Sequence, residues 1–286
     1  MAKAREIKRR IKGVSSTQKI TRTMEMIATA KAKVTQNRLR TLLPYADGLA
    51  EMTAGLVGTV PHPLLKPRDE IRKVVLMVLS SNRGLCGGYN TNIINLAREV
   101  LTREQEAGRE VELVVSGKKG IGFFQRRKVT MAKTYTHFED RVTFEEADAL
   151  AGPWRDRYLA EDIDRVILVS CRYHSSGVQK PGEVVLLPLE KKGGDESSGV
   201  REDYIYEPDP KSILDGLLPL SVSVAFLQAL AEATGCEQIA RRVAMKLATD
   251  NADELLRFLT RNYNRARQSQ ITQELSEIMG GAEALA

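Results

Sequence analysis

The chain has 286 residues, of which 42% are hydrophobic, 28% are charged and only 5% are aromatic. This composition is typical of a soluble protein with room for one ordinary core and some additional helical mass. The longest apolar run, Val74 to Leu79, is too short to span a bilayer, and the N-terminus carries charges where a signal peptide would be apolar. We therefore expect a cytosolic protein.

The net charge of +6 is concentrated at one end of the chain. Residues 1–60 contain twelve basic and four acidic residues, whereas the remainder contains 31 basic and 33 acidic residues. This excess favours an acidic partner for the N-terminal segment, either a protein surface or a polyanion. A solvated helix face is the alternative.

Apolar residues three and four positions apart predict a long helix from about Ala4 to about Val57. The helix contains Pro44, a residue that kinks helices, and it should end before the two prolines at residues 61 and 63. The stripe has a polar gap at Gln18. Its predicted members are Ile7, Ile11, Val14, Ile20, Met24, Ile27, Ala30 and Val34.

The middle of the chain, from Ile71 to about Tyr206, alternates short apolar runs with helical patterns. Such alternation predicts a small α/β domain with a mostly parallel sheet. Thr143 and Glu146 have the spacing of a capping box at the start of a helix. The strands are expected near Val74 to Leu79, Glu112 to Val115, Val129 to Tyr135, Val166 to Val169 and Val184 to Leu187, and the helices at Asn90 to Glu106, Lys119 to Arg126 and Thr143 to Ala160; a polar surface loop follows at Glu190 to Arg201.

The residues that could carry chemistry do not form a recognisable catalytic pattern. The loop from Ser81 to Tyr89 follows the first strand, where nucleotide-binding folds place a phosphate loop, but it lacks the Walker and dinucleotide glycine spacings. A tight strand-to-helix turn is the better interpretation. The histidines at 62, 137 and 174 and the cysteines at 86, 171 and 236 lack metal-ligand or redox spacing. We expect no enzyme activity, no metal and no cofactor, and we expect the thiols to be buried or idle.

The last stretch, Leu220 to Ala286, reads as one unbroken helix. At 1.5 Å per residue it would be about 100 Å long, more than a compact domain can cover. An isolated amphipathic helix is unstable, so it needs a partner of similar length, which the N-terminal helix supplies. We predict an α/β fold class: an antiparallel coiled coil of residues 1–60 and 220–286, a Rossmann-like domain at 70–206 and a connector at 207–219. The predicted C-terminal stripe is Val222, Phe226, Ala229, Ala233, Cys236, Ala240, Val243, Leu247, Asn251, Leu255, Phe258, Asn262 and Ala266.

Several motifs closely resemble the gamma subunit of bacterial F-type ATP synthase, and the resemblance covers the chain in order. The N-terminal helix matches through Thr17-Gln18-Lys19-Ile20-Thr21 and Met24-Glu25-Met26-Ile27-Ala28-Thr29-Ala30-Lys31. The middle matches at Arg83-Gly84-Leu85-Cys86-Gly87-Gly88 and Tyr206-Glu207-Pro208-Asp209-Pro210-Lys211. The tail matches through Ala248-Thr249-Asp250-Asn251-Ala252, Tyr263-Asn264-Arg265-Ala266-Arg267-Gln268 and Ile271-Thr272-Gln273-Glu274-Leu275.

The resemblance implies a non-catalytic central rotor shaft. In that family the coiled coil turns inside a hexamer of alpha and beta subunits and couples proton-driven rotation of the c ring to the catalytic cycle of beta. The α/β domain contacts epsilon and the c ring. The implied location is peripheral, at the cytoplasmic face of the bacterial inner membrane, and no nucleic acid is involved. The competing hypotheses are a free-standing coiled-coil adaptor and a basic helix protein that binds nucleic acid.

The resemblance also assigns partner-contact residues. Met24 matches a methionine near an acidic loop of beta, although a coiled-coil core methionine would fit equally well. Arg241 matches a family arginine, and Arg242 replaces the methionine that usually follows it, so we expect Arg242 to face water or an acidic partner. Contacts with beta are further implied for Arg267, Gln268, Thr272 and Glu274, and the small, apolar end segment Ile278 to Ala286 is implied to lie in an apolar sleeve.

Overall fold

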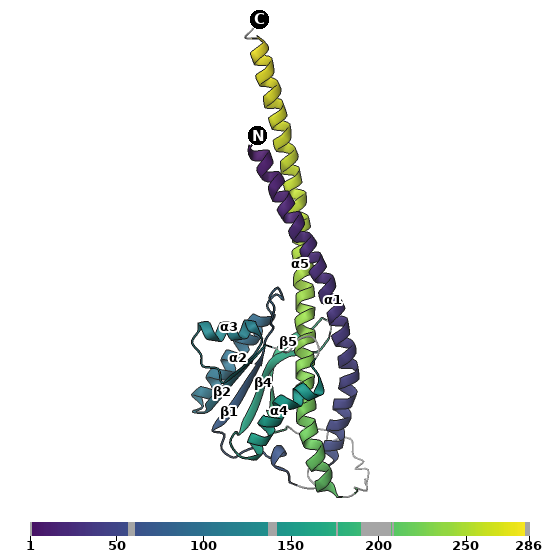
Figure 1. Ribbon diagram of the computed structural model, residues 1–286, viewed down its shortest axis with the longest axis vertical. Coiled ribbons are helices and arrows are strands. Elements are labelled where there is room, and N and C mark those ends of the chain that lie inside the picture. Colours follow the sequence, from purple (N-terminus) through teal and green to yellow (C-terminus); the bar gives the residue numbers. More distant parts are fainter. Residues whose placement is uncertain are drawn as a thin grey trace. The chain divides into compact units, whose positions relative to one another are not determined.

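The computed structural model describes residues 2–56, 61–136, 142–175, 177–189, 207 and 209–283. These residues form two compact units. The paired-helix unit consists of Met1–Thr29 and Arg241–Ala286, and the sheet unit of Ala30–Ala240. Helix α1 (Ala2–Leu56) and helix α5 (Pro210–Glu283) each contribute residues to both units (Figure 1).

A five-stranded sheet with the order β3-β2-β1-β4-β5 is the centre of the sheet unit. The first four strands pair in parallel, whereas β4 and β5 pair antiparallel, so the predicted mostly parallel sheet is confirmed. The chain runs from β1 through α2 to β2 and through α3 to β3, and β4 then pairs with the other side of β1. The strands are β1 (Lys73–Leu79), β2 (Glu110–Ser116), β3 (Lys133–Tyr135), β4 (Arg165–Tyr173) and β5 (Gln179–Leu187).

Both faces of the sheet are covered by helices. Strand β1 is buried from Val74 to Leu79, and its residues contribute alternately to two apolar clusters. One cluster joins the sheet to α4 (Phe144–Leu159) and to α5, and the other joins it to α2 (Tyr89–Glu106) and α3 (Lys118–Arg126). Because parallel strands covered on both faces have few polar positions, they read as continuous apolar runs in the sequence.

Two local signals place the ends of elements where the sequence predicts them. The Thr143 side chain accepts a hydrogen bond from the Glu146 amide at 3.3 Å, and the Glu146 carboxylate accepts one from the Thr143 amide at 2.9 Å. The predicted capping box is confirmed. The loop from Ser81 to Gly88 is a strand-to-helix turn between β1 and α2, fastened by hydrogen bonds from the Ser81 hydroxyl to the Arg83 carbonyl at 2.6 Å and from the Asn90 amide to the Ser81 hydroxyl at 2.8 Å.

Several predicted boundaries are wrong. Strand β4 extends to Tyr173 and strand β5 begins at Gln179 rather than Val184, so the turn that joins them is shorter than the sequence indicates. Helix α5 begins at Pro210 rather than Leu220, because proline is tolerated in the first turn of a helix and Asp209 accepts hydrogen bonds from the Lys211 and Ser212 amides, each at 2.9 Å. Pro219 lies inside the helix and does not end it. Strand β3 covers only Lys133–Tyr135 because its first predicted residues form a loop that follows α3.

Within the sheet unit, α5 is fixed to β4 by a buried carboxylate. Glu232 is 5% exposed and lies 3.1 Å from the guanidinium of Arg172. It also accepts hydrogen bonds from the Tyr173 amide at 3.3 Å and from the Gln228 side chain at 2.8 Å. Buried carboxylates are tolerated in proteins when they are paired and hydrogen-bonded, so these contacts hold the Glu232 side chain in place where α5 meets the sheet.

One segment of α5 is unusually apolar. It includes an 18-residue window with a mean hydropathy of 1.8, which is sufficient by length and composition to cross a membrane. Half of that window is buried inside the fold. A helix that packs on a sheet passes the same test, and residues of α5 such as Val222 and Phe226 belong to the core.

The remaining predictions concern the cysteines and residues outside the described part of the chain. Cys86, Cys171 and Cys236 are all free and buried, as the sequence predicts. The surface loop predicted at Glu190 to Arg201 and the histidine at position 137 lie outside the described residues, as do the last three residues of the predicted end segment.

His62 gives the sheet unit a pH-dependent contact. Its Nδ1 accepts a hydrogen bond from the Leu64 amide at 3.1 Å, which caps a short 3₁₀ turn, η1 (Pro63–Leu65), and its Nε2 lies 3.4 Å from Asp215 of α5. Burial lowers the pKa of His62 below its ordinary value of 6.5; Asp215 opposes this shift and Lys211 adds to it. The unfolded chain therefore binds this proton more tightly than the folded chain.

We expect the contribution of His62 to folding stability to be present above pH 6.5 and to be lost as the pH falls through and below that value. Urea unfolding midpoints at pH 7.5 and pH 5.5 would measure it. His62→Asn is the matched control, because an asparagine oxygen can cap the turn without titrating in this range. The variant should lose less stability between the two pH values than the original chain; an equal or larger loss would contradict the assignment.

Candidate partner-contact surface

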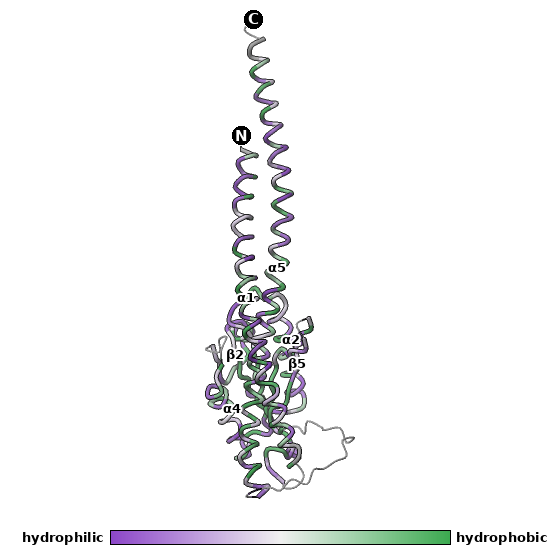
Figure 2. Tube along the Cα trace, turned by 90° about the vertical axis from the view of Figure 1, so that its right-hand side faces the viewer, coloured by the Kyte–Doolittle hydropathy of each residue, from purple (hydrophilic) through white to green (hydrophobic). Residues whose placement is uncertain are grey.

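The paired-helix unit is built on two rows of side chains that repeat every three and four residues. These rows are buried or half-buried, as expected when two helices pair along a seven-residue repeat. Figure 2 shows hydrophilic and hydrophobic residues intermixed along both helices. The rows are Ile7, Ile11, Val14, Gln18, Thr21, Glu25 and Ala28 on α1 and Arg241, Met245, Thr249, Ala252, Leu256, Leu259, Tyr263, Ala266 and Gln270 on α5.

Two side-chain pairs show that the helices are antiparallel. The Gln18 amide donates a short hydrogen bond to the Asp253 carboxylate, and the hydroxyls of Thr21 and Thr249 lie 2.8 Å apart. Moving forward on α1 from residue 18 to 21 moves the contact backward on α5 from residue 253 to 249. The predicted antiparallel pairing is therefore confirmed within this unit.

The predicted apolar stripe includes several residues of the paired helices that do not lie in the seam. Ile20 and Ile27 are 60% and 52% exposed, and Leu247 and Phe258 are 58% and 51% exposed. The error arises because the seam is polar at Gln18, so the predicted stripe passes over this residue and continues at Ile20. Two positions along a helix turn the side chain by about 200°, so Ile20 points away from the side on which Gln18 lies. Beyond Val14 the predicted stripe therefore follows an exposed face, while Gln18 and Thr21 are the residues that lie in the seam.

Four of the six predicted contact residues lie together on α5, and all four are exposed: Arg267, Gln268, Thr272 and Glu274. The Thr272 hydroxyl donates to the Gln268 carbonyl at 3.0 Å, and the Gln270 side chain donates to the Glu274 carboxylate at 2.8 Å. These bonds are local to the helix, so the outward faces of the four side chains stay accessible to another molecule.

The other two predicted residues lie elsewhere in the unit. Met24 is half-buried beside the seam, whereas Arg241 is only 6% exposed. Arg241 and Arg267 are separated by roughly 39 Å along the helix axis, since each residue rises 1.5 Å. Arg242, expected to face water or an acidic partner, is half-buried. The structure therefore does not bring all six residues to one place.

An exposed apolar row on the C-terminal part of α5 extends the apolar end segment predicted from Ile278 back to Ile271 and Leu275, which the sequence analysis did not identify as part of it. Ile271, Leu275 and Ile278 are 46%, 56% and 68% exposed, and Met279 is 70% exposed. No residue from Ile271 to Gly280 is buried. The spacing of four and three residues was the available signal. Apolar rows of this kind mark a surface that another protein covers.

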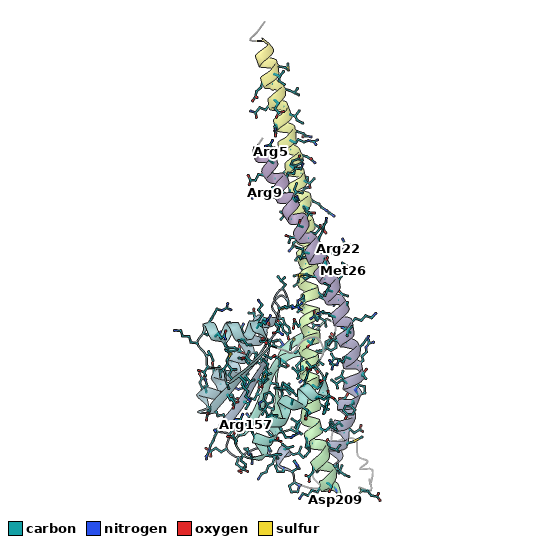
Figure 3. The ribbon with its side chains drawn as sticks, viewed as in Figure 1. Arg5, Arg9, Arg22, Met26, Arg157 and Asp209 are labelled. Carbon is teal, nitrogen blue, oxygen red and sulfur yellow. The ribbon has the colours of Figure 1, made fainter. Side chains whose placement is uncertain are left out.

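Basic side chains extend along α1 of the same unit. Figure 3 shows Arg5, Arg9 and Arg22 on this helix, together with the exposed Met26. Arg10 forms an ion pair with Glu6 of the preceding turn at 2.8 Å. The surface of the unit thus combines positive charge with isolated exposed apolar residues, a combination suited to a protein partner with acidic and apolar parts.

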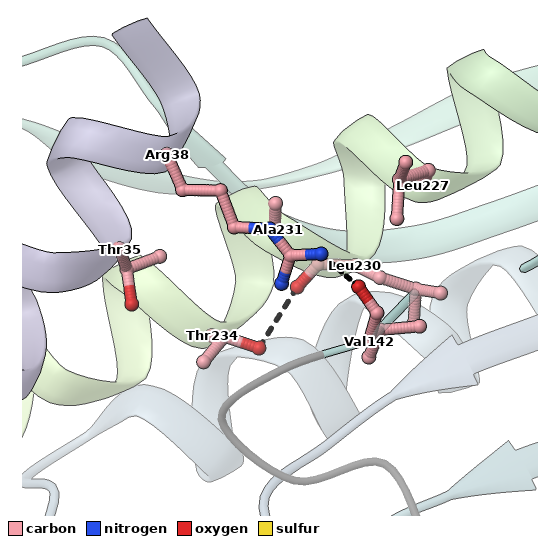
Figure 4. A pocket seen from close by; sticks show the side chains of 7 residues that line it. All are labelled: Thr35, Arg38, Val142, Leu227, Leu230, Ala231 and Thr234. Carbon is pink, nitrogen blue, oxygen red and sulfur yellow. Dashed lines mark hydrogen bonds between the residues drawn. The ribbon is translucent and has the colours of Figure 1, made fainter. Parts of the chain in front are cut away.

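The described residues contain no group of three or more histidine, cysteine or acidic side chains arranged to hold a metal ion. A small hollow in the sheet unit lies between α1, α5 and Val142 (Figure 4). There the Arg38 guanidinium donates to the Val142 carbonyl, and the Thr234 hydroxyl donates to the Leu230 carbonyl at 2.9 Å. The first bond connects α1 to the segment before α4, and the second lies within α5.

Comparisons with known proteins agree on the family. The sequence model of the family described as ATP synthase matches residues 3–285. The ATP synthase gamma chain of Leptospira biflexa is 45% identical over the whole of both chains, and that of Chlorobaculum tepidum is 40% identical over 100% of this chain and 99% of the relative.

Two solved structures share the fold. A chain from the rotor of Euglena gracilis mitochondrial ATP synthase has a TM-score of 0.66 at 20% identity and covers 94% of this chain and 99% of its own length. A chain from the central stalk and c ring structure of the Tetrahymena thermophila enzyme has a TM-score of 0.59 at 20% identity and covers 80% and 99%.

The architecture defines the class of protein: two terminal helices paired antiparallel, combined with a five-stranded α/β unit, as in these rotor and central-stalk chains. The chain belongs to the ATP synthase gamma chain family, because it matches gamma chains from end to end at up to 45% identity.

Proposed function

We propose that this chain is the central rotor shaft of an F-type ATP synthase. It couples proton-driven rotation of the c ring to the conformational cycle of the catalytic beta subunits. The observation that carries this proposal is the match to ATP synthase gamma chains over the full length of both chains, which includes both terminal helices and the sheet unit. The chain itself catalyses no reaction and needs no cofactor.

The paired helices suit this work mechanically. A shaft must resist twisting, and two helices joined along a seam resist it better than one. The seam contains small residues such as Ala28 and Ala252, which allow the helix backbones to approach closely.

The proposed partners are the alpha and beta subunits around the paired helices, and epsilon and the c ring at the sheet unit. The chain does not bind nucleic acid. Its association with the membrane is peripheral and runs through the c ring, at the cytoplasmic face of a bacterial inner membrane. The excess of basic residues in the first 60 positions supports an acidic protein partner for α1.

Co-expression with the alpha and beta subunits of the same organism tests the proposal. We expect the three chains to co-elute in size exclusion as a complex that hydrolyses ATP. A nucleic-acid-binding protein would instead remain apart and bind polyanions with an affinity that falls steeply with salt. A free-standing adaptor would also remain apart from alpha and beta. Failure to co-elute would count directly against the shaft.

We further propose that two zones of the paired-helix unit contact beta. Met24 and Arg241 belong to one zone, and Arg267, Gln268, Thr272 and Glu274 to the other. The exposure of the second zone and the local hydrogen bonds that order it support this assignment. Arg267 is the strongest candidate for a direct contact, because a guanidinium forms charge-assisted hydrogen bonds in a fixed geometry.

Arg267→Ala should lower the turnover of the assembled complex on the order of tenfold while leaving assembly intact. The estimate follows from the roughly 1.5–3 kcal/mol of a hydrogen bond to a charged group. Arg261→Ala is the matched control, since Arg261 is an exposed arginine on the same helix and outside the proposed zone. ATP hydrolysis and ATP-driven proton pumping would be measured for both variants. Equal losses in the two variants would refute the assignment of Arg267.

A further inference from the structure

Four polar side chains meet in the seam of the paired-helix unit, where apolar residues would be expected. Gln18 donates to Asp253, and three residues further along α1 the hydroxyl of Thr21 lies 2.8 Å from that of Thr249. The two threonines are 9% and 6% exposed, so these hydroxyls are shielded from water. Most of the residues around them in the two rows, such as Val14 and Leu256, are apolar, and Glu25 on α1 is an exception.

The threonine pair is a costly choice if stability alone is required. Valine has nearly the same shape as threonine and would fill the same space without a hydroxyl to satisfy. Each hydroxyl also lies within reach of a carbonyl on its own helix, Thr21 of Gln18 at 3.0 Å and Thr249 of Met245 at 2.9 Å. Because each threonine has one proton, one hydroxyl donates across the seam and the other donates to its own helix. Polar residues in a helix seam are known to specify the alignment of the helices at the expense of stability.

We propose that Gln18, Thr21, Thr249 and Asp253 form a register lock that fixes how far α1 is displaced along α5. In the observed alignment every one of these side chains faces a polar partner. A seven-residue slide keeps the rows in contact but changes the partners. In one direction Thr21 would face Leu256 and Asp253 would face Glu25; in the other, Thr21 would face Arg242 and Asp253 would face Ile11.

Both slides are therefore opposed by specific penalties. The first removes the hydrogen bond between the two threonine hydroxyls and places two carboxylates together, and the second places the half-buried Asp253 carboxylate against an isoleucine. The small and apolar residues elsewhere in the seam give little resistance, because one aliphatic side chain can replace another at nearly the same spacing. The four polar residues thus select the register, while the apolar members of the two rows supply most of the contact between the helices.

A fixed register matters for torque, and this consequence rests on the proposed function. If the two helices could slide past each other by one heptad, part of the applied torque would cause sliding and would not be transmitted along the shaft. The lock itself is a property of the chain alone, so it can be tested without the other subunits. Failure of the lock and failure of the rotor role would therefore appear in different experiments.

The test uses cysteine pairs in the full-length chain. Val14→Cys with Leu256→Cys reports the observed register, in which these two positions are opposite. Val14→Cys with Tyr263→Cys reports the alignment shifted by one heptad. A short bifunctional thiol reagent would be applied to both pairs in the original background and in a lock-free background carrying Gln18→Leu, Thr21→Val, Thr249→Val and Asp253→Leu. The three native cysteines are buried and serve as the unlabelled baseline.

In the original background we expect cross-linking of the first pair, with the shifted pair at less than about a tenth of its yield. In the lock-free background the yield of the shifted pair should rise roughly tenfold, and the thermal midpoint should not fall. Thr21→Ser with Thr249→Ser, which retains both hydroxyls, should keep the original pattern.

Three results would overturn the lock. The lock-free chain could cross-link only in the observed register, which would mean that other contacts set it. It could fail to fold while the serine variant folds, which would mean that the polar residues supply stability rather than alignment. The serine variant could itself give the shifted product, which would show that the two hydroxyls do not fix the alignment of the helices.

Discussion

Phe226→Ala should lower the free energy of unfolding of the chain by about 3–5 kcal/mol, the typical cost of removing a buried aromatic side chain. Phe226 is fully buried in the cluster that joins α5 and α4 to the sheet. Its ring meets that of Trp154 edge to face, with centroids 5.4 Å apart and an angle of 83° between the ring planes. Removing the ring leaves a cavity and ends this contact.

Urea unfolding followed by the fluorescence of Trp154, the only tryptophan, would measure the loss. Phe258→Ala is the control, because Phe258 lies on the same helix but is 51% exposed. In the isolated chain it should cost less than about 1 kcal/mol, as surface substitutions usually do. Similar losses for the two variants would show that α5 is not anchored to the sheet through this cluster.

Gly117→Ala is expected to be nearly as damaging, at about 4 kcal/mol. Gly117 lies after β2 with φ at 94°, in a region that side chains rarely occupy. A Cβ there would overlap the backbone carbonyl of Ser80 and lie 2.6 Å from the Ser80 hydroxyl oxygen. Since the obstacle is mostly backbone at the end of β1, the strain cannot be relieved by a rotamer change.

Gly108→Ala separates the two causes of that loss. Gly108 has a φ of 76°, but no heavy atom lies within 4 Å of the position of its Cβ. It should therefore cost only the conformational strain, about 1 kcal/mol. The same urea experiment measures both variants. If the two glycine substitutions had equal effects, the close approach of β1 and β2 at Gly117 would not be important for stability.

The sheet unit was largely predictable from the sequence because its signals are local and repeated. Val74 to Leu79 is apolar on both faces, as a strand covered by helices on both sides requires. Thr143 and Glu146 mark the start of α4 through a pair of hydrogen bonds that depends only on these two residues, three positions apart. Strand order was not predictable in detail, since it depends on contacts between segments far apart in the chain.

The seam of the paired helices was harder to predict because it is partly polar. A search for apolar residues favours Ile20 and Ile27, which are exposed, over Gln18 and Thr21, which are covered. The strict seven-residue spacing from Ile7 through Val14 to Thr21 was the better guide. Hydrogen bonds between helices satisfy the polar side chains, and these bonds have no signature in a single sequence.

Among the predicted contact residues, the exposure of some could be predicted from the sequence and the burial of one could not. Exposure of Arg267, Gln268, Thr272 and Glu274 follows from their place on α5 beyond most of the seam, which the family resemblance indicated. The burial of Arg241 could not be read from its charge, since a lone arginine on a helix is usually solvated. Only the row on α5 that includes Met245 and Thr249 shows that position 241 belongs to a covered face.

Direct observation of rotation tests the central claim most sharply. The complex of this chain with alpha and beta would be fixed to a surface through the hexamer, and a visible probe attached to Gln125→Cys, an exposed position on α3. With ATP present, the probe should rotate continuously in one direction, and it should stop when ATP hydrolysis is inhibited. A complex that hydrolyses ATP at its full rate while the probe stays still, or only diffuses in both directions, would contradict the rotor-shaft function.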